Sequence, residues 1–250
     1  MSITGGDPLG TSLFCAENHP FTSALILASG NGTRMGTDVA KQFLEIKGRS
    51  VLERAVDPFE ACGYIDEIII TCREKDLSRV AELVNINKWK KIKTIISGDK
   101  TRQESAYKAF CAISDISEFV AVHDAARCLI RCEDIDAVAE EAFKYGAAIA
   151  VSKVKDTVKI IRDDSSVVHT PERDALAAAG TPQIFGRYEY KKAAEFVRSS
   201  GLSVTDDSMM LELCGIRVRV VDVGDENIKI TSPSDLYTAE HIIEERSLKS

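Results

Sequence analysis

Cationic residues stand just after a glycine-containing turn near the start of this sequence. An apolar run at 23–28 leads into Ser-Gly-Asn-Gly-Thr, which is followed by Arg34 and, seven residues later, by Lys41. Glycines after a buried strand let backbone N–H groups approach phosphate oxygens, and an arginine guanidinium offers those oxygens a rigid fork of donors. The spacing therefore predicts a phosphate-binding turn. The alternative is an ordinary strand-to-helix turn with solvated cations.

Two common nucleotide motifs do not fit this turn. The dinucleotide-binding fingerprint needs a third glycine where Met35 stands, and the P-loop needs a Gly-Lys-Ser/Thr sequence that this stretch lacks. A dehydrogenase of the dinucleotide-binding type is therefore a poor match.

A second candidate site is Ala-Val-His-Asp-Ala-Ala-Arg at 121–127. Asp124, at the end of an apolar run, could bind a ribose hydroxyl or Mg²⁺, and Arg127 could bind an anion. The alternative is an Asp–Arg ion pair at the start of the next helix. We expect His123 to be a buried, hydrogen-bonded structural residue rather than a catalytic base.

Two more segments place polar residues after strands. At 97–107 the backbone around Gly98, together with Ser105, could read the edge of a base, while Thr101 and Glu104 have the spacing of a capping box. Lys229 lies between two isoleucines at 228 and 230, so it is either a charge on a strand edge or a cation directed into a site.

The elements that must position these residues alternate along the chain. Short apolar runs predict strands at 23–28, 67–72, 92–96, 118–123, 147–154 and 217–223. Helical patterns lie at 50–62, 76–85, 102–114, 133–144, 187–200 and 234–247. This order predicts an α/β, Rossmann-like three-layer domain with a mostly parallel twisted sheet, whose ligands bind at the carboxyl ends of the strands.

One segment, 154–174, breaks the alternation, because two β-rich stretches flank a polar turn. It predicts a protruding β-hairpin arm. An isolated hairpin is marginally stable in water, so we expect it to pack against a second copy of the chain in a homodimer.

Composition excludes several classes of function. The net charge of −7 argues against binding to nucleic acid or to anionic membranes, and no apolar run is long enough for a membrane span. Residues 1–22 have no basic or apolar targeting pattern, and we expect a flexible extension before a single domain at 23–250. The odd count of scattered cysteines predicts reduced thiols and a cytoplasmic protein; the spacing of Cys128 and Cys132 lacks the second pair that a zinc site needs.

Taken together, the glycine turns, the aspartate and the cations suit a nucleoside triphosphate with Mg²⁺. The sequence offers no arrangement typical of a protein nucleophile. A phosphomonoester needs none, because it is largely a dianion at neutral pH and can attack a phosphorus directly. Catalysis then consists of positioning two anions and neutralising the charge that develops.

Nine short motifs, in order from residue 23 to the last helix, carry a resemblance to a known family. They are LASGNGTRM, AKQFL, GDKTRQES, VHDAAR, KDTVK, HTPERDAL, GTPQIF, TDDS and ENIKITSPSDL. The sequence closely resembles the 2-C-methyl-D-erythritol 4-phosphate cytidylyltransferases of the non-mevalonate isoprenoid pathway. The resemblance implies transfer of CMP from CTP to this polyol phosphate, with release of pyrophosphate.

The resemblance also implies roles for residues at the matching positions. Arg34, Lys41, Arg173 and Lys229 would be catalytic. The CTP-binding residues would be Ala28, Ser29, Gly30, Gly32, Gly98, Asp99, Ser105 and Asp124, with Asp124 also near Mg²⁺. The polyol phosphate would be bound by Arg127, Thr157, Arg173, Thr181 and Lys229, with Thr157 and Arg173 reaching the site of the neighbouring subunit from the arm.

The sequence departs from the family pattern without losing a charge. Ser29 stands where alanine is usual, Ala40 and Cys128 where proline is usual, and Gly180 where glutamine is common. Two other functions stay open. One is a cytidylyltransferase for a pentitol phosphate such as ribitol 5-phosphate, and the other is a nucleotide-binding regulator without catalysis.

Overall fold

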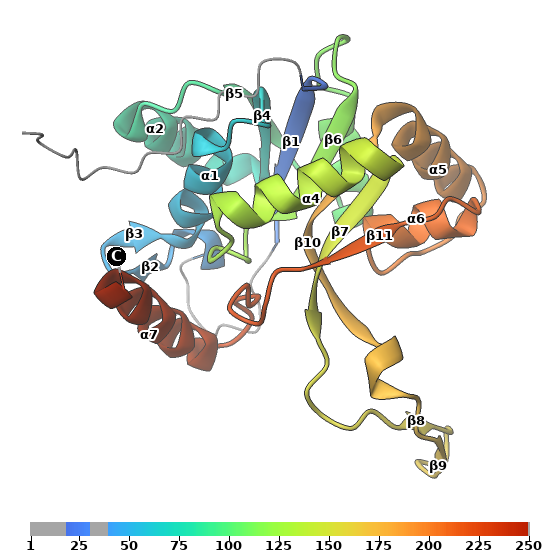
Figure 1. Ribbon diagram of the computed structural model, residues 1–250. Coiled ribbons are helices and arrows are strands. Elements are labelled where there is room, and N and C mark those ends of the chain that lie inside the picture. The colour runs from blue at the N-terminus through green and yellow to red at the C-terminus, as the bar shows by residue number, and fades with distance from the viewer. Residues whose placement is uncertain (1–18, 31–39, 250) are drawn as a thin grey trace, which may run out of the picture.

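A seven-stranded sheet forms the centre of the molecule (Figure 1). The computed structural model describes residues 19–30 and 40–249. The strand order is β11-β7-β10-β6-β1-β4-β5, and every pairing in the sheet is parallel except the two made by β10. The strands are β1 (Thr22–Leu27), β4 (Glu67–Cys72), β5 (Ile92–Ser97), β6 (Phe119–Asp124), β7 (Ala147–Lys153), β10 (Ala177–Gly186) and β11 (Arg219–Asp222). The predicted mostly parallel sheet is confirmed.

Helices cover both faces of this sheet, which gives the predicted three layers. Side chains of β1 alternate between the layers: Ala24 and Ile26 join the core with α1, α2, α4 and α7, whereas Leu25 and Leu27 join the core with α3, α5 and α6. The helices are α1 (Val51–Ala61), α2 (Leu77–Asn87), α3 (Arg102–Phe110), α4 (Cys132–Tyr145), α5 (Arg187–Ser199), α6 (Asp207–Leu213) and α7 (Pro233–Lys249).

Short elements complete the described chain. They are β2 (Glu45–Ile46) and β3 (Arg49–Ser50), which pair with each other, and the 3-10 turns Lys41–Phe43, Glu74–Asp76 and Arg173–Ala175. Thr22 begins β1, although the predicted extension included it. Among the described residues, no helix is both long enough and apolar enough to cross a membrane.

Strand β10 was not predicted, although it lies between β6 and β7 and runs antiparallel to both. Its sequence, AAAGTPQIFG, contains alanine, glycine and proline, which have low strand propensity. The ladder to β7 shifts register between Ala179 and Gln183, and the Thr181–Pro182 peptide bond is cis. Tertiary pairing therefore overrides local preference in this strand.

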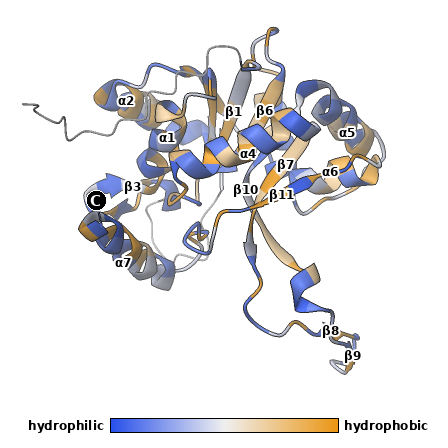
Figure 2. Cartoon of the chain, viewed as in Figure 1, coloured by the Kyte–Doolittle hydropathy of each residue, from blue (hydrophilic) through white to orange (hydrophobic). Residues whose placement is uncertain are grey.

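The predicted arm leaves the sheet between β7 and β10 and extends away from the rest of the chain (Figure 1). Its tip is a hairpin of β8 (Ile160–Ile161) and β9 (Val167–His169), whose strands are shorter than the sequence suggested. Five apolar side chains on the arm are exposed: Val158, Ile160, Ile161, Val167 and Val168. Hydrophobic residues at this end of the molecule are visible in Figure 2. The hairpin is confirmed, whereas dimerisation through it stays a prediction.

Candidate active site

The topology of the sheet creates a crevice between β1 and β6. The chain runs from β1 outward to β4 and β5, then returns to the other side of β1 as β6. At such a switch point the loops at the carboxyl ends of two adjacent strands diverge, which leaves room for a ligand. A cavity of about 470 Å³ lies there. We call it the strand-end cavity; its lining includes Ala28, Ser29, Gly30, Lys41, Asp99, Lys100, Arg102, Asp124, Ala125, Ala126 and Lys229.

Asp124 is the centre of charge in this cavity. Its Oδ1 accepts a hydrogen bond from Arg102 Nε at 2.8 Å, and its Oδ2 accepts one from Lys229 Nζ at 2.6 Å. Burial by itself would raise the pKa of Asp124, but the two cations outweigh that effect and hold it well below the usual range. The carboxylate is therefore ionised at neutral pH, and it fixes two cations at the carboxyl end of β6.

The position of Lys229 follows from a backbone contact. Ile230 is fully buried, and its N–H donates to the carbonyl of Ala126 at 2.8 Å, which ties the segment after β11 to the loop after β6. No strand forms at Lys229. Lys229 is therefore not a charge on a strand edge, and it lines the strand-end cavity.

Arg102 links the cavity to the protein interior, and sequence reasoning missed it as a site residue. Its Nη1 donates to Asp207 Oδ2 at 2.6 Å, and Asp207 Oδ1 accepts from the hydroxyl of Tyr190 at 3.0 Å. Asp207 is only 1% exposed and Tyr190 is fully buried. This chain of contacts holds the guanidinium rigidly beside Asp124. In the sequence, Thr101 and Glu104 were assigned to a capping box, and the arginine between them was not considered. An arginine in the first helical turn after a glycine loop is nevertheless a residue type that binds anions, and this could have indicated a role for Arg102 in the site.

The turn after β5 is built around Ser105. Its hydroxyl donates to the carbonyl of Thr101 at 2.8 Å and accepts from the N–H of Asp99 at 2.8 Å and the hydroxyl of Ser29 at 3.2 Å. The predicted capping box of Thr101 and Glu104 is present at the start of α3. Ser105 is 1% exposed and does not line the cavity, so its observed contacts are with the two loops rather than with open space.

Gly98 lies where these two loops touch. A Cβ at residue 98 would overlap the Cβ of Ser29 and press on the Oγ of Ser105. Ala28 donates its N–H to Thr71, and Gly98 donates its N–H to Cys72, which continues the sheet ladder past the ends of the strands. Close approach, rather than an unusual backbone angle, therefore requires glycine here.

His123 is fully buried, as the sequence predicted, and its ring lies between the loop after β6 and strand β10. Nε2 is 3.1 Å from the carbonyl of Arg127, so it carries the proton; Nδ1 is 3.0 Å from Thr181 Oγ1 and accepts its hydroxyl hydrogen. The Thr181 oxygen in turn accepts the N–H of Asp124 at 3.1 Å. Burial lowers the pKa of His123 to about 3. The imidazole is therefore neutral, and it links the loop that follows Asp124 to strand β10.

Arg127 is bound by backbone carbonyls of two other segments of the chain. Its guanidinium donates to the carbonyls of Asn227 at 2.9 Å and Ala179 at 3.1 Å, and burial lowers its pKa. A Cβ at Gly180 would lie 3.6 Å from the Arg127 Cζ. Arg127 and Thr181 are thus close to Asp124 in the fold but do not line the strand-end cavity.

Of the remaining predicted residues that the structure describes, only Lys41 is seen in the cavity lining. Thr157 and Arg173 lie on the exposed arm, and Arg173 Nη1 donates to the carbonyl of Lys155 at 3.3 Å. One chain therefore does not bring them to the cavity. Arg34 and Gly32 lie outside the described residues. Lys41 is in the lining, in a short turn whose next two residues, Gln42 and Phe43, are buried.

The residues that line the strand-end cavity can be compared with the ligands that Mg²⁺ usually takes. The described lining holds four cationic side chains and two carboxylates, those of Asp99 and Asp124. Mg²⁺ at a nucleotide site typically takes one or two carboxylates together with substrate phosphates. The lining fits that pattern, with phosphate oxygens as the main ligands, although both oxygens of Asp124 accept hydrogen bonds from cations in this structure.

Comparison with known proteins gives the same assignment along nearly the whole chain. The family model for 2-C-methyl-D-erythritol 4-phosphate cytidylyltransferase matches residues 22–245. Proteins of that name from Desulforamulus reducens and Clostridium perfringens are 36% and 37% identical to the chain; the matches span 90% and 88% of this chain and 96% and 97% of those proteins.

Solved structures of similar proteins support the same family. The structure of 4-diphosphocytidyl-2C-methyl-D-erythritol synthase from Anaerococcus prevotii has a TM-score of 0.81 at 34% identity, covering 90% of this chain and 96% of that one. The 2-C-methyl-D-erythritol 4-phosphate cytidylyltransferase from Thermus thermophilus has a TM-score of 0.71 at 28% identity, covering 89% and 98%. This chain therefore belongs to the 2-C-methyl-D-erythritol 4-phosphate cytidylyltransferase family.

Proposed function

We propose that this protein transfers CMP from CTP to 2-C-methyl-D-erythritol 4-phosphate. A phosphate oxygen of the polyol substrate attacks the α-phosphorus of CTP, and the bond from that phosphorus to the bridging oxygen of the β-phosphate breaks. The products are 4-diphosphocytidyl-2-C-methyl-D-erythritol and pyrophosphate. The observation that carries the proposal is the pair of cations on Asp124, fixed at the carboxyl end of β6 inside a cavity of nucleotide size.

The chain's own residues supply positioning and charge. Backbone groups of 28–30 and of Gly98–Asp99 frame the cytosine end of the cavity, with Ser105 bracing the turn. Lys229 holds the α-phosphate, while Lys41, together with Arg34, neutralises charge on the triphosphate side. Removing one contact of this kind from a developing anion typically slows a reaction by about 100- to 1000-fold. Bound Mg²⁺ would neutralise further phosphate charge.

The second substrate is held by groups from two chains. Arg127 and Thr181 lie next to Asp124 in the same chain. Thr157 and Arg173 come from the arm of a neighbouring subunit. The exposed valines and isoleucines of the arm support a homodimer, because such side chains are stabilised when a partner covers them. The net charge of −7 favours phosphate-bearing small molecules held by local cations over nucleic acid or membrane partners. We expect the enzyme to work in the cytoplasm.

A pyrophosphate-release assay tests the assignment. The purified protein is given CTP and Mg²⁺ with either 2-C-methyl-D-erythritol 4-phosphate or ribitol 5-phosphate, and with ATP, GTP or UTP in place of CTP. We expect release with CTP and the methylerythritol substrate. Preference for ribitol phosphate would assign the pentitol function, and CTP binding without turnover on either substrate would assign a regulator. A Lys229→Met variant, prepared identically, controls for contaminating activity.

A further inference from the structure

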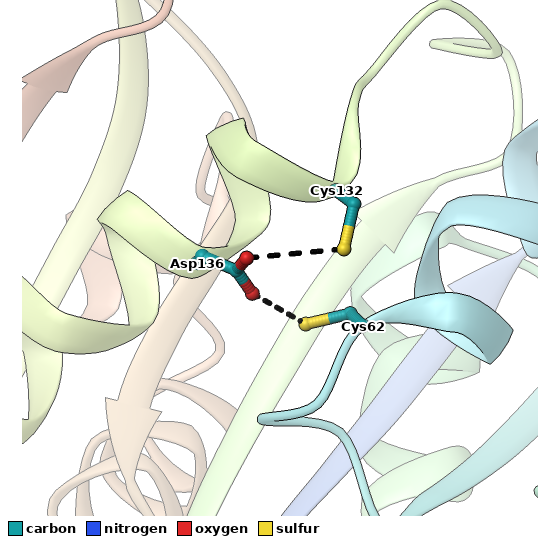
Figure 3. Close-up of side chains that lie close together, drawn as sticks. All are labelled: Cys62, Cys132 and Asp136. Carbon is teal, nitrogen blue, oxygen red and sulfur yellow. Dashed lines mark hydrogen bonds between the residues drawn. The ribbon is translucent and has the colours of Figure 1, made fainter. Parts of the chain in front are cut away.

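Two thiols and a carboxylate converge outside the strand-end cavity, and none of the three residues lines that cavity. Cys62, Cys132 and Asp136 point toward one another (Figure 3), and their ligand atoms all lie within 4.8 Å of each other. The Sγ of Cys62 is 3.0 Å from Asp136 Oδ1, and the Sγ of Cys132 is 3.8 Å from Asp136 Oδ2. Because Cys132 follows Cys62 by seventy positions in the chain, the cluster exists only in the folded protein.

The elements that carry the cluster are well fixed. Cys62 is the C-cap residue of α1 and is fully buried. Cys132 is the first residue of α4, and Asp136 stands one turn later on the same helix face. Both are partly exposed, so an ion can enter from solvent and keep a water ligand. Glu140, one further turn along α4, accepts the hydroxyl of Tyr64 at 3.0 Å and adds negative charge beside the opening.

These spacings are close to those of a tetrahedral metal site. Zinc binds thiolate at about 2.3 Å and carboxylate oxygen at about 2.0–2.2 Å, so ligand atoms around one tetrahedral ion lie roughly 3.5–3.8 Å apart. The two observed sulfur–oxygen distances, 3.0 Å to Oδ1 and 3.8 Å to Oδ2, involve different oxygens of Asp136, and one ligand atom from each residue lies within 4.8 Å of the others. Small side-chain rotations suffice to place all three atoms on one ion.

We propose that Cys62, Cys132 and Asp136 bind one thiophilic divalent cation of the zinc class, with water as the fourth ligand. Two sulfur ligands select against Mg²⁺ and Ca²⁺, which take oxygen ligands. On binding, each thiol gives up its proton to solvent as its sulfur–metal bond forms, and the carboxylate accepts the ion in place of the two thiol hydrogens. The site differs in chemistry from the strand-end cavity, whose lining contains no cysteine among the described residues.

The position of this site gives it a structural consequence. The ion joins the end of α1 to the beginning of α4, two helices that pack on the same face of the sheet. The loop that precedes α4 follows Asp124, the last residue of β6, and includes Ala125 and Ala126, which line the strand-end cavity. Binding therefore stabilises the fold, because an ion held by two separate elements is bound only in the folded chain.

Cobalt provides a direct test. The full-length protein, kept reduced with a phosphine, is titrated with Co²⁺ and followed by the sulfur-to-cobalt charge-transfer absorption, then back-titrated with Zn²⁺. We expect one Co²⁺ per chain, an intensity for two thiolates, displacement by Zn²⁺ and a rise in Tm with Zn²⁺. Cys132→Ser is expected to lower the affinity at least about 100-fold. The exposed Cys111→Ser is the matched control and retains full binding.

Asp136→Asn provides an independent check that leaves both thiols in place. We expect weaker binding with the thiolate absorption still present at high Co²⁺, and circular dichroism establishes that each variant is folded. The proposal is overturned if the reduced protein shows no thiolate absorption at saturating Co²⁺. It is equally overturned if binding is unchanged in both Cys132→Ser and Asp136→Asn. None of these readouts depends on turnover, so they stand apart from the assay of CTP chemistry.

Discussion

The Nζ of Lys229 lies 2.6 Å from the Oδ2 of Asp124, although 105 positions separate the two residues in the chain. Asp124 ends strand β6, whereas Lys229 belongs to the segment between β11 and α7. The contact places a cation at the switch point of the sheet and orients it with a second cation, Arg102, on the other carboxylate oxygen. The geometry of this trio leads to the first two predictions.

Lys229→Met removes a cation that we place on the α-phosphate. We expect kcat/KM for CTP and methylerythritol phosphate to fall by about 100- to 1000-fold, because charge that develops in the transition state loses a preorganised partner. Asp124 keeps its bond to Arg102, so the fold should persist. Lys191→Met on α5, an exposed lysine, is the control. Equal rates in the two variants would remove Lys229 from the reaction.

We expect Arg102→Met to lower the free energy of unfolding as well as to disturb the strand-end cavity. It leaves Asp207, which is 1% exposed, with an uncompensated buried charge, and such losses typically cost about 3–5 kcal/mol. Denaturant unfolding measures the free energy. Adding Asp207→Asn should recover a large part of it, because the buried charge is then gone. Arg131→Met breaks an ion pair of a half-exposed arginine and should cost at most about 1 kcal/mol.

The low pKa of the buried His123 leads us to expect a specific dependence of stability on pH. Its folded pKa of about 3 lies below the unfolded value of about 6.5, so the unfolded chain binds a proton first as the pH falls. Stability from this residue is complete above pH 6.5 and declines by up to about 1.4 kcal/mol per pH unit below it. Unfolding free energies between pH 7 and 5 should therefore fall less steeply in His123→Gln than in the unmodified protein. Parallel slopes would contradict the burial of a neutral imidazole.

Gly98→Ala should damage the nucleotide turn through contact alone. The new Cβ overlaps the Cβ of Ser29, and overpacking of this kind typically costs about 1–3 kcal/mol. We expect a lower Tm and a higher KM for CTP, because the backbone at 28–30 has to move. Ser29→Gly in the same chain removes the obstructing atom and should restore part of both. Ser29→Gly alone serves as control, and absence of any rescue would place the effect elsewhere.

The arm prediction can be tested by mixing subunits. We expect Arg173→Ala and Lys229→Met homodimers each to be nearly inactive. Co-expression with two different tags produces heterodimers in which one site carries both substitutions and the other carries neither. Activity should then return to about a quarter of the unmodified level in a statistical mixture, because one site in each heterodimer is intact. If Arg173 acted within its own chain, no heterodimer site would be complete and activity would stay low.

Much of this protein could be read from local patterns. Short apolar runs located six of the seven sheet strands. Four of them, β1, β4, β6 and β7, are largely buried, and a strand buried on both faces needs a short apolar segment in any context. Glycine turns and strand-end charges drew Asp124, Lys41 and Lys229 into the predicted site, and all three line the strand-end cavity; their roles in the reaction stay predictions. His123 was predicted correctly to be buried and hydrogen-bonded, because an imidazole at the end of an apolar strand is more often a core residue than a catalytic base.

Other features depended on contacts that no local pattern contains. β10 is a strand because β6 and β7 pair with it on both sides, although alanine, glycine and proline disfavour that state. Arg102 joins the site because Asp207 and Asp124, which are far apart in sequence, meet its guanidinium. Cys132 faces Cys62 rather than acting with Cys128, because α1 and α4 pack side by side. The amino-acid order alone determined which residues could do chemistry, and folding in three dimensions decided which of them meet, because distances between remote residues are set by packing.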